Sequence, residues 1–573
     1  MKKAIKTISV VITLILCAGV FFACKPASGN PVDPTKSQLA VYNYDGGVGT
    51  EWLEKAVEIF EKKYEDTHFE PGVYVNGVEK KGVQISIYRG KALPIPSASS
   101  YNVFFLEHVA YNDLISQKEV LDITDIVTEN LSGVTGGAES GTIANKLSAG
   151  QKQAITAIDG KYYVLPHYAV FNGVTYDKDL FHKKEFYFAK AGGWTDNNGL
   201  KSVGPDGIAD TYDDGLPSSY EEFYALMQRM RQLSVTPFIW TGQYADFYTN
   251  TLLLGLWAAY CGEKEFMLNV NFGTGESQGV QTEIITDFTA NNLFGDSALK
   301  GKIPVSSKTT ITPGDGYLTQ QQAGLYYAMT MLETIMATSA NYSSKITGVL
   351  SHMDAQEEFI RGALEGNPIG MLMEGNWWYN EASDAFKRSV NVYKEDAENR
   401  NFAWMPLPWK ITGTVAEGHG RKNTLSDTLS SFAFINANIG NNANIAKLAK
   451  LFLQFCYTDE QLADFTLTNG VLKGVNYTIG GDKLDGMDNF CRSVYDTAKA
   501  SDIAYPYSAN QIFINAQSAF EMSFVSPYFK STVSGTPYNY PYTAFQKGAN
   551  SEAYFKGTWK TKQAWDTLYQ QYY

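Results

Sequence analysis

The chain has 573 residues, of which 44% are hydrophobic and 19% are charged, and its formal net charge is −13. This acidic balance, without a basic stripe anywhere, disfavours nucleic acid as a partner because a polyanion is repelled before contact. A chain of this length and apolar content can bury several times the core of a minimal domain. We therefore expect two or more lobes.

The N-terminus has the pattern of an export signal. Three lysines precede an apolar run at 8–22, which is too short for a comfortable membrane span. The following Phe21-Phe22-Ala23-Cys24 resembles the lipobox at which bacterial lipoproteins are cleaved and lipidated, although the two phenylalanines depart from its usual pattern. We predict a signal peptide over 1–23 and lipidation at Cys24. The alternative is an ordinary secretory signal with a chance cysteine.

The segment 24–37 is rich in Pro, Ser, Gly and Asn, and has almost nothing to bury. Such a composition predicts a flexible tether. Cleavage before Cys24 would remove the three lysines and shift the formal charge from −13 to −16. The expected location is the cell surface or the periplasmic face, with the chain attached to the cell membrane by a lipid anchor at Cys24.

The segments after the tether alternate between strand and helix patterns. A β-prone run at 38–44 ends at a glycine turn, and an amphipathic helix follows Thr50. Further strands are predicted at 83–88 and 102–106, with a hairpin insertion at 70–81. This order favours an α/β architecture in which helices bury a sheet.

Helix signals are also clear in the second half of the chain. Ser219 and Glu222 form a capping box before an apolar helix face. A helix is predicted at 444–457, and a second one starts at Thr458 and ends at Gly470. The C-terminal helix carries Trp565 on its apolar face, so we expect it to dock on the fold.

Cysteine and histidine spacing argues against several enzyme classes. Cys261, Cys456 and Cys491 lack metal-ligand or redox spacing and are expected to be small buried residues, with one disulfide left open. The six histidines show no zinc-ligand spacing, and no Gly-x-Ser-x-Gly elbow is present.

The segment 157–181 carries a hydrophobic-Asp-Gly-Lys-aromatic turn, a Leu-Pro crossing and a closing Tyr-Asp-Lys-Asp-Leu-Phe. It resembles the core of the family 1 extracellular solute-binding proteins, the maltose-binding-like receptors of ABC importers. Segments with the same resemblance follow in the expected order at 216–223, 370–378, 429–437, 444–454 and 556–569. Together they span nearly the whole chain after the tether.

The resemblance implies an α/β, two-lobed periplasmic-binding-protein-like fold of type II, with hinge strands between the lobes. Lobe 1 would take 38–165 and 426–475, and lobe 2 would take 166–425 and 476–573. Leu165-Pro166-His167 is the first candidate crossing, because proline restricts the preceding residue to extended geometry. The implied partners are a small-molecule solute, an oligosaccharide above all, and the membrane permease subunits of an ABC importer, with the receptor itself a monomer.

A sugar pocket needs aromatic platforms for C–H faces and carboxylates or amides for hydroxyls. Positions after predicted strands supply such groups, and the candidate ligand-binding residues are Asp45, Glu107, His108, Trp240, Tyr244 and Trp377. Asp45 could equally form a turn with its neighbouring glycine, and Glu107 and His108 could end a solvated loop. Trp377 is preferred over its neighbour Trp378 because adjacent residues on an extended segment point to opposite sides.

The loop 196–215 concentrates acids, amides and glycines. Oxygen-rich loops of this kind bind Ca²⁺, although the spacing departs from the EF-hand pattern. Asp206, Asp210, Asp213 and Asp214 are the candidate ligands of a structural calcium ion, and a solvated acidic loop is the alternative. No cofactor is otherwise required.

The function that these patterns favour is binding without turnover: an extracellular substrate-binding lipoprotein that captures a carbohydrate between two lobes and delivers it to a permease. The alternatives are a secreted glycoside hydrolase, which needs two carboxylates flanking the scissile bond, and a binding protein for a non-sugar solute such as a peptide. No segment suggests the eight-fold βα repeat of a barrel hydrolase.

Overall fold

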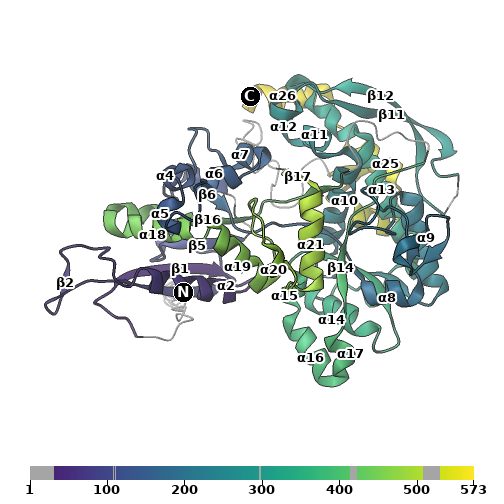
Figure 1. Cartoon of the computed structure of the whole chain (residues 1–573). Helices are drawn as coiled ribbons and strands as arrows, with labels where there is room; N and C mark the ends of the chain where they lie inside the picture. The colour runs from purple at the N-terminus through teal and green to yellow at the C-terminus, as the bar shows by residue number, and fades with distance from the viewer. Residues whose placement is uncertain are drawn as a thin grey trace, which may run out of the picture.

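The computed structural model describes residues 31–107, 109, 111–295, 298–412, 422–506 and 530–572. The predicted signal peptide and Cys24 lie outside these residues. Among the described residues, no helix is both long enough and apolar enough to cross a membrane. Figure 1 shows two lobes side by side, each built around its own sheet.

The sheet of lobe 1 has five strands in the order β4-β1-β5-β16-β6. These are β4 (Val83–Gly90), β1 (Ser37–Tyr44), β5 (Val103–Glu107), β16 (Ser431–Ile435) and β6 (Val164–Pro166). β1 is parallel to β4 and β5, whereas β16 returns from the far end of the chain and runs antiparallel to β5 and β6. A returning strand inserted between the third and fourth strands of the lobe is the arrangement expected of the type II fold, so the predicted fold class is confirmed.

Helices cover both faces of this sheet, and they include α2 (Glu51–Lys63), α18 (Ala443–Phe455) and α19 (Asp459–Asn469). Smaller helices lie between β5 and β6: α3 (Tyr111–Ser116), α4 (Thr124–Thr128), α5 (Ser132–Thr135), α6 (Ile143–Lys146) and α7 (Ala149–Ile155). The predicted insertion at 70–81 is the hairpin β2 (Tyr74–Val75) and β3 (Val78–Glu79). β1 begins at the buried Ser37, inside the segment expected to be a tether.

The sheet of lobe 2 has the order β10-β13-β7-β14. Its strands are β10 (Thr236–Ile239), β13 (Ile369–Gly375), β7 (Asn172–Asp177) and β14 (Phe402–Met405), with β7 antiparallel to both of its neighbours. Its helices are α8 (Lys178–Lys184), α9 (Tyr220–Gln232), α10 (Ala245–Cys261), α11 (Glu263–Phe266), α12 (Leu268–Asn271), α13 (Ala323–Met336), α14 (His352–Gly362), α15 (Trp378–Glu381), α16 (Ser383–Tyr393), α17 (Glu395–Glu398), α20 (Gly481–Leu484), α21 (Asn489–Ala500), α24 (Pro541–Gln546), α25 (Ser551–Thr558) and α26 (Lys562–Tyr572).

Four two-stranded ribbons accompany the lobe 2 sheet. They are β8 (Tyr187–Phe188) with β9 (Trp194–Thr195), β11 (Gln281–Asn292) with β12 (Lys302–Thr310), β15 (Thr424–Ser426) with β17 (Asp502–Ala504), and β18 (Ser531–Val533) with β19 (Thr536–Tyr538). The capping box of Ser219 and Glu222 opens α9 as predicted, and Gly470 ends α19 in the left-handed conformation. Trp565 docks α26 by donating its indole N–H to the carbonyl of Pro313 at 2.9 Å.

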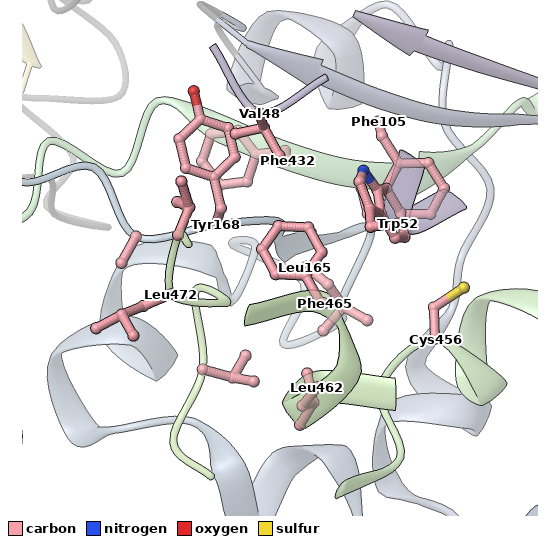
Figure 2. Close-up of a cluster of buried hydrophobic side chains, with 14 of the residues drawn as sticks. Val48, Trp52, Phe105, Leu165, Tyr168, Phe432, Cys456, Leu462, Phe465 and Leu472 are labelled. Carbon is pink, nitrogen blue, oxygen red and sulfur yellow. The ribbon is translucent and has the colours of Figure 1, made fainter. Parts of the chain in front are cut away.

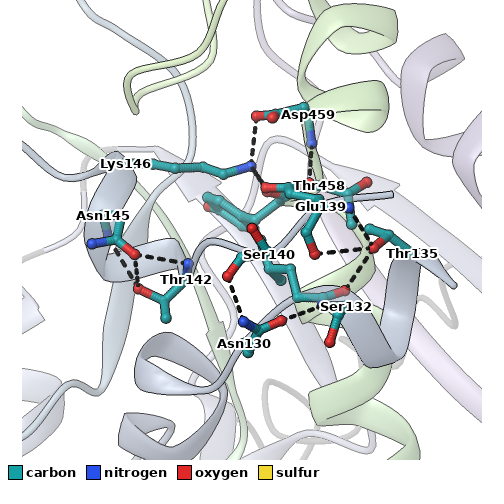
Figure 3. A network of polar contacts seen from close by, with 12 residues as sticks. Asn130, Ser132, Thr135, Glu139, Ser140, Thr142, Asn145, Lys146, Thr458 and Asp459 are labelled. Atoms are coloured by element: carbon teal, nitrogen blue, oxygen red, sulfur yellow. Dashed lines mark hydrogen bonds and ion pairs between the residues drawn. The ribbon is translucent and has the colours of Figure 1, made fainter. Parts of the chain in front are cut away.

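A buried polar network fixes α19 in lobe 1, as Figure 3 shows. Lys146, from α6, lies 2.5 Å from the Glu139 carboxylate and 2.8 Å from that of Asp459, the first residue of α19. It also donates to the carbonyl of Tyr457 at 2.8 Å. The Lys146 side chain is buried and that of Glu139 nearly so, so loss of Glu139 would leave a buried charge uncompensated, whereas Asp459 is exposed and orients the start of α19.

The cysteine prediction is confirmed for Cys261, Cys456 and Cys491, which are buried and free. Trp404 and Trp409 are also buried, consistent with structural roles. The core of lobe 1 continues toward lobe 2 through Trp378, Phe402 and Phe490, which are all 1% exposed or less. These three rings belong to lobe 2, so one apolar cluster extends from lobe 1 into lobe 2.

Candidate functional site between the lobes

Three chain segments cross between the lobes and lie next to one another: 167–171, 427–430 and 472–475. Single β-bridges join Tyr168 to Lys473 and Phe171 to Asp427. Backbone hydrogen bonds run from Ala169 N to Leu472 O at 2.9 Å and from Thr428 N to Val170 O at 3.2 Å. The crossing predicted at 165–167 begins at His167 instead, because Leu165 and Pro166 still belong to β6.

Asp427 is the polar centre of these crossings. Its Oδ1 accepts the backbone N–H groups of Val170 at 3.2 Å and Leu429 at 2.8 Å, although the side chain is buried. Burial raises the pKa of Asp427 to about 6, and the two backbone donors oppose this rise. One carboxylate therefore holds two of the crossings together.

Lobe 1 meets lobe 2 at the glycine turn after β1. Asn380, in α15, donates its side-chain N–H to the carbonyl of Gly47 at 2.7 Å. A Cβ on Gly47 would lie only 2.7 Å from Cδ1 of Trp377, and the same indole packs against Gly375 at the end of β13. The Trp377 ring thus lies between two glycines, one from each lobe, where no side chain separates it from either backbone.

Three carboxylates lie near this contact, and they come from both lobes: Glu107 ends β5, Glu374 is in β13 and Glu381 is in α15. Burial raises the pKa of Glu107 to about 7, and the negative charge of Glu381 adds to this effect. Burial also raises the pKa of Glu374 to about 8, and the negative charge of Glu381 is the next largest cause. The influence of Glu381 on both residues places the three groups within electrostatic range of one another.

Neighbouring side chains organise these acids. Gln356 donates its amide to Glu374 at 3.3 Å and to Glu381 at 2.8 Å. Tyr168 is hydrogen-bonded to Glu107, and Tyr248 to Glu374. The site therefore combines acid acceptors with tyrosine rings, which suits a ligand rich in hydroxyl groups.

Four of the residues predicted from the sequence come together at this boundary. They are Asp45, Glu107, Tyr244 and Trp377. Burial raises the pKa of Tyr44, and the charges of Glu107, Asp45 and Tyr244 raise it further. Trp377 lies against Gly47, two residues after Asp45. Tyr244 is 52% exposed, and its ring lies 6.1 Å from that of His352.

Of the other two predicted residues, Trp240 lies away from the site and His108 cannot be placed. Trp240 requires a correction, because it is 1% exposed and packs against Tyr342 and Tyr542 in the core of lobe 2. The strand before it delivers its side chain into the lobe rather than toward the boundary. His108 lies outside the described residues.

Sequence reasoning missed Tyr168, Tyr248, Gln356, Glu374 and Glu381. Glu374 had a readable signal, because an acid directly before a glycine at the end of an apolar strand is a candidate edge group. The remaining four come from segments whose meeting depends on the tertiary fold.

A groove of about 360 Å³ opens beside Asn380, at the margin of this contact. Lobe 2 lines it with Tyr379, Asn380 and Ser383, and α19 of lobe 1 contributes Thr466 to Asn469. Its walls therefore belong to both lobes.

The acidic loop is ordered by its own carboxylates. Asp213 accepts from the backbone N–H of Asp206 at 2.9 Å, and Asp214 accepts from that of Asp210 at 2.9 Å. Burial raises the pKa of Asp213 to about 7. Across the described residues, no group of three or more His, Cys, Asp or Glu side chains is placed to hold a metal ion. Calcium binding by this loop stays a hypothesis.

No family model and no curated protein matches the chain. Solved structures similar to it include a chitin oligosaccharide binding protein, with 13% identity and a TM-score of 0.49 over 93% of this chain and 99% of that chain. The binding protein RafE in complex with raffinose has 12% identity and a TM-score of 0.49, over 93% of this chain and 100% of that one. Maltose-bound MalE3 of T. maritima has the same identity, TM-score and coverage of both chains.

Likenesses at this identity concern the backbone alone. The fold itself follows from the sheet order of lobe 1 and the three adjacent crossings. On those grounds, the chain has the two-lobed α/β fold expected of the family 1 extracellular solute-binding proteins.

Proposed function

We propose that this chain is the extracellular substrate-binding lipoprotein of an ABC importer and that it captures a carbohydrate between its lobes. The observation that carries the proposal is the meeting of both lobes at one site, where Trp377 lies against Gly47 and Glu107 lies within electrostatic range of Glu381. Flat rings and acid acceptors on opposing lobes suit the C–H faces and hydroxyls of a sugar.

The adjacent crossings supply the mechanics. A hinge of a few residues lets the lobes part and close, and a ligand that contacts both lobes favours the closed form by its differential affinity. A permease can then distinguish the loaded receptor from the empty one. In this proposal Cys24 carries the lipid anchor, the chain acts as a monomer, and the permease subunits are its membrane partners.

The test is a thermal-shift screen of the purified chain against maltose, raffinose and chitin oligosaccharides, followed by analysis of the sugars. The proposal expects a rise in melting temperature for at least one sugar, with the sugar recovered intact. Solution scattering should show compaction with the same sugar. A screen in which only peptides raise the melting temperature would replace the carbohydrate with the peptide alternative.

A glycoside hydrolase remains the second candidate because Glu107 has the raised pKa, about 7, that suits a general acid. Released reducing ends, lost in Glu107→Gln, would support it. Anchoring is tested separately, because Cys24→Ser should move the protein from the membrane fraction to the medium or periplasm without changing sugar affinity.

A further inference from the structure

Asn172 carries a buried amide that finds no hydrogen-bond partner in the described part of the chain. It is the first residue of β7, directly after the crossing 167–171, and it is 9% exposed. Among the described residues, neither Oδ1 nor Nδ2 has a hydrogen-bond partner, and both atoms are buried. Folded proteins rarely leave both polar atoms of a buried amide unpaired, because each loses its hydrogen bonds to water without compensation. The amide therefore requires an explanation outside the fold.

The sheet register places this amide at the site. Asn172 lies directly opposite Gly375 in the antiparallel ladder of β7 and β13. Residues directly opposite each other point to the same face of a sheet. A Cβ on Gly375 would point into the indole of Trp377, so the Asn172 side chain projects from the face on which that indole lies.

A neighbouring amide shows what a structural asparagine looks like here. Asn376 follows β13, is 1% exposed and has both polar atoms paired. Its Oδ1 accepts from the backbone N–H of Phe171 at 3.1 Å, and its Nδ2 donates to the carbonyl of Ala169 at 3.0 Å. The Asn376 side chain joins the end of β13 to the first crossing by two hydrogen bonds. The Asn172 side chain, one residue beyond that crossing, makes no such bond with the described residues.

We infer that the carboxamide of Asn172 is a ligand-binding group, and that it holds adjacent hydroxyls of the captured sugar beside the Trp377 indole. This inference rests on the proposed function. An amide offers one acceptor and two donors, so it pairs with two neighbouring hydroxyls, one donating and one accepting. Because both amide atoms are covered while Trp377 contacts Gly47, ligand entry requires the lobes to part.

The experiment compares Asn172→Ala with the matched control Asn376→Ala. Without sugar, the urea midpoint of Asn172→Ala should equal or exceed that of the wild type, because an unpaired buried amide is removed, whereas Asn376→Ala should lower the midpoint. With a sugar that the wild type binds, calorimetry should show an affinity loss of about tenfold or more for Asn172→Ala.

The two arms separate the possible failures. A fall in the urea midpoint of Asn172→Ala that matches the Asn376→Ala fall would overturn the inference, since the amide would then be structural. Unchanged sugar affinity in Asn172→Ala would also overturn it. If the wild type binds none of the sugars, the proposed function fails, and a raised urea midpoint for Asn172→Ala would still show that the fold does not use this amide.

Discussion

Lys473 is a buried amine in the third crossing, and it is 2% exposed. Its Nζ lies 2.8 Å from Nδ1 of His167 on the first crossing. Four aromatic rings surround it with centroids 4.5 to 5.4 Å away: those of Trp52, Phe105, Tyr457 and Phe465. Figure 2 labels three of these rings in the cluster beside the crossings. Replacing Lys473 with methionine removes the amine and keeps the length and apolar character of the side chain.

The expected effect is a change in how stability depends on pH. Burial lowers the pKa of Lys473 from 10.5 to about 7. Between these values the unfolded chain binds more protons than the folded chain, so the free energy of unfolding rises with pH. This group alone contributes about 1.4 kcal/mol per pH unit, or about 3 kcal/mol between about pH 7 and pH 9. Below the folded pKa the amine is charged in both states and its burial penalty is fully present.

The assay is urea unfolding at several pH values for the wild type and Lys473→Met. The difference between the two free energies of unfolding should change by about 3 kcal/mol between about pH 7 and pH 9. Lys387→Met is the control, because the Lys387 side chain is 74% exposed. Its pH profile should run parallel to that of the wild type. Parallel profiles for Lys473→Met as well would refute the reasoning, and would mean that the four ring faces keep the amine charged.

Other perturbations test the site directly. Gly47→Ala should weaken sugar binding about tenfold or more, because the added Cβ would lie 2.7 Å from Trp377 and oppose closure of the lobes. The free energy of unfolding should stay nearly unchanged. Calorimetry checks the affinity, and an affinity equal to that of the wild type would contradict the prediction. Glu374 has a pKa of about 8, raised by burial from 4.5, so its contribution to stability falls as pH rises between these values. Above about pH 8, Glu374→Gln should therefore have a higher urea midpoint than the wild type. A rise in the urea midpoint that occurs only at acid pH would contradict this prediction. If calcium binds at the loop of Asp213, adding calcium should raise the melting temperature of the protein, and a chelator should lower it again. An unchanged melting temperature would end that hypothesis.

Local signals in the sequence predicted local structure well. The capping box at Ser219 and the glycine at Gly470 each satisfy backbone groups within one turn of chain, so they act before any tertiary contact forms. The strand patterns gave the sheet of lobe 1 because its central strands are apolar and bounded by turn residues. The family resemblance then supplied the return of β16, which no local pattern could place.

The candidate site was harder to predict because its groups come from distant segments. An aromatic residue after a strand can face a ligand or the core, and only the packing around Trp240 decides between them. Gln356 and Glu381 meet through a hydrogen bond between two helices of lobe 2. The burial of Lys473 could not be read from its neighbours in sequence, because its four rings come from α2, β5 and the region of α19.

The hydrogen bonds at the boundary between the lobes and those at the hinge respond differently when the lobes part. At the hinge, backbone bonds such as Ala169 N to Leu472 O join the crossings to one another, so they can persist while the lobes rotate. At the boundary, the bond from Asn380 to Gly47 joins lobe 2 to lobe 1, so it must break when the lobes part. Since Asn172 and Trp377 lie on the same face of the lobe 2 sheet, we expect opening both to break this bond and to uncover an amide that needs a partner. A sugar that pairs with the amide and contacts lobe 1 would then favour reclosure, which is how an otherwise costly buried amide can serve a binding protein.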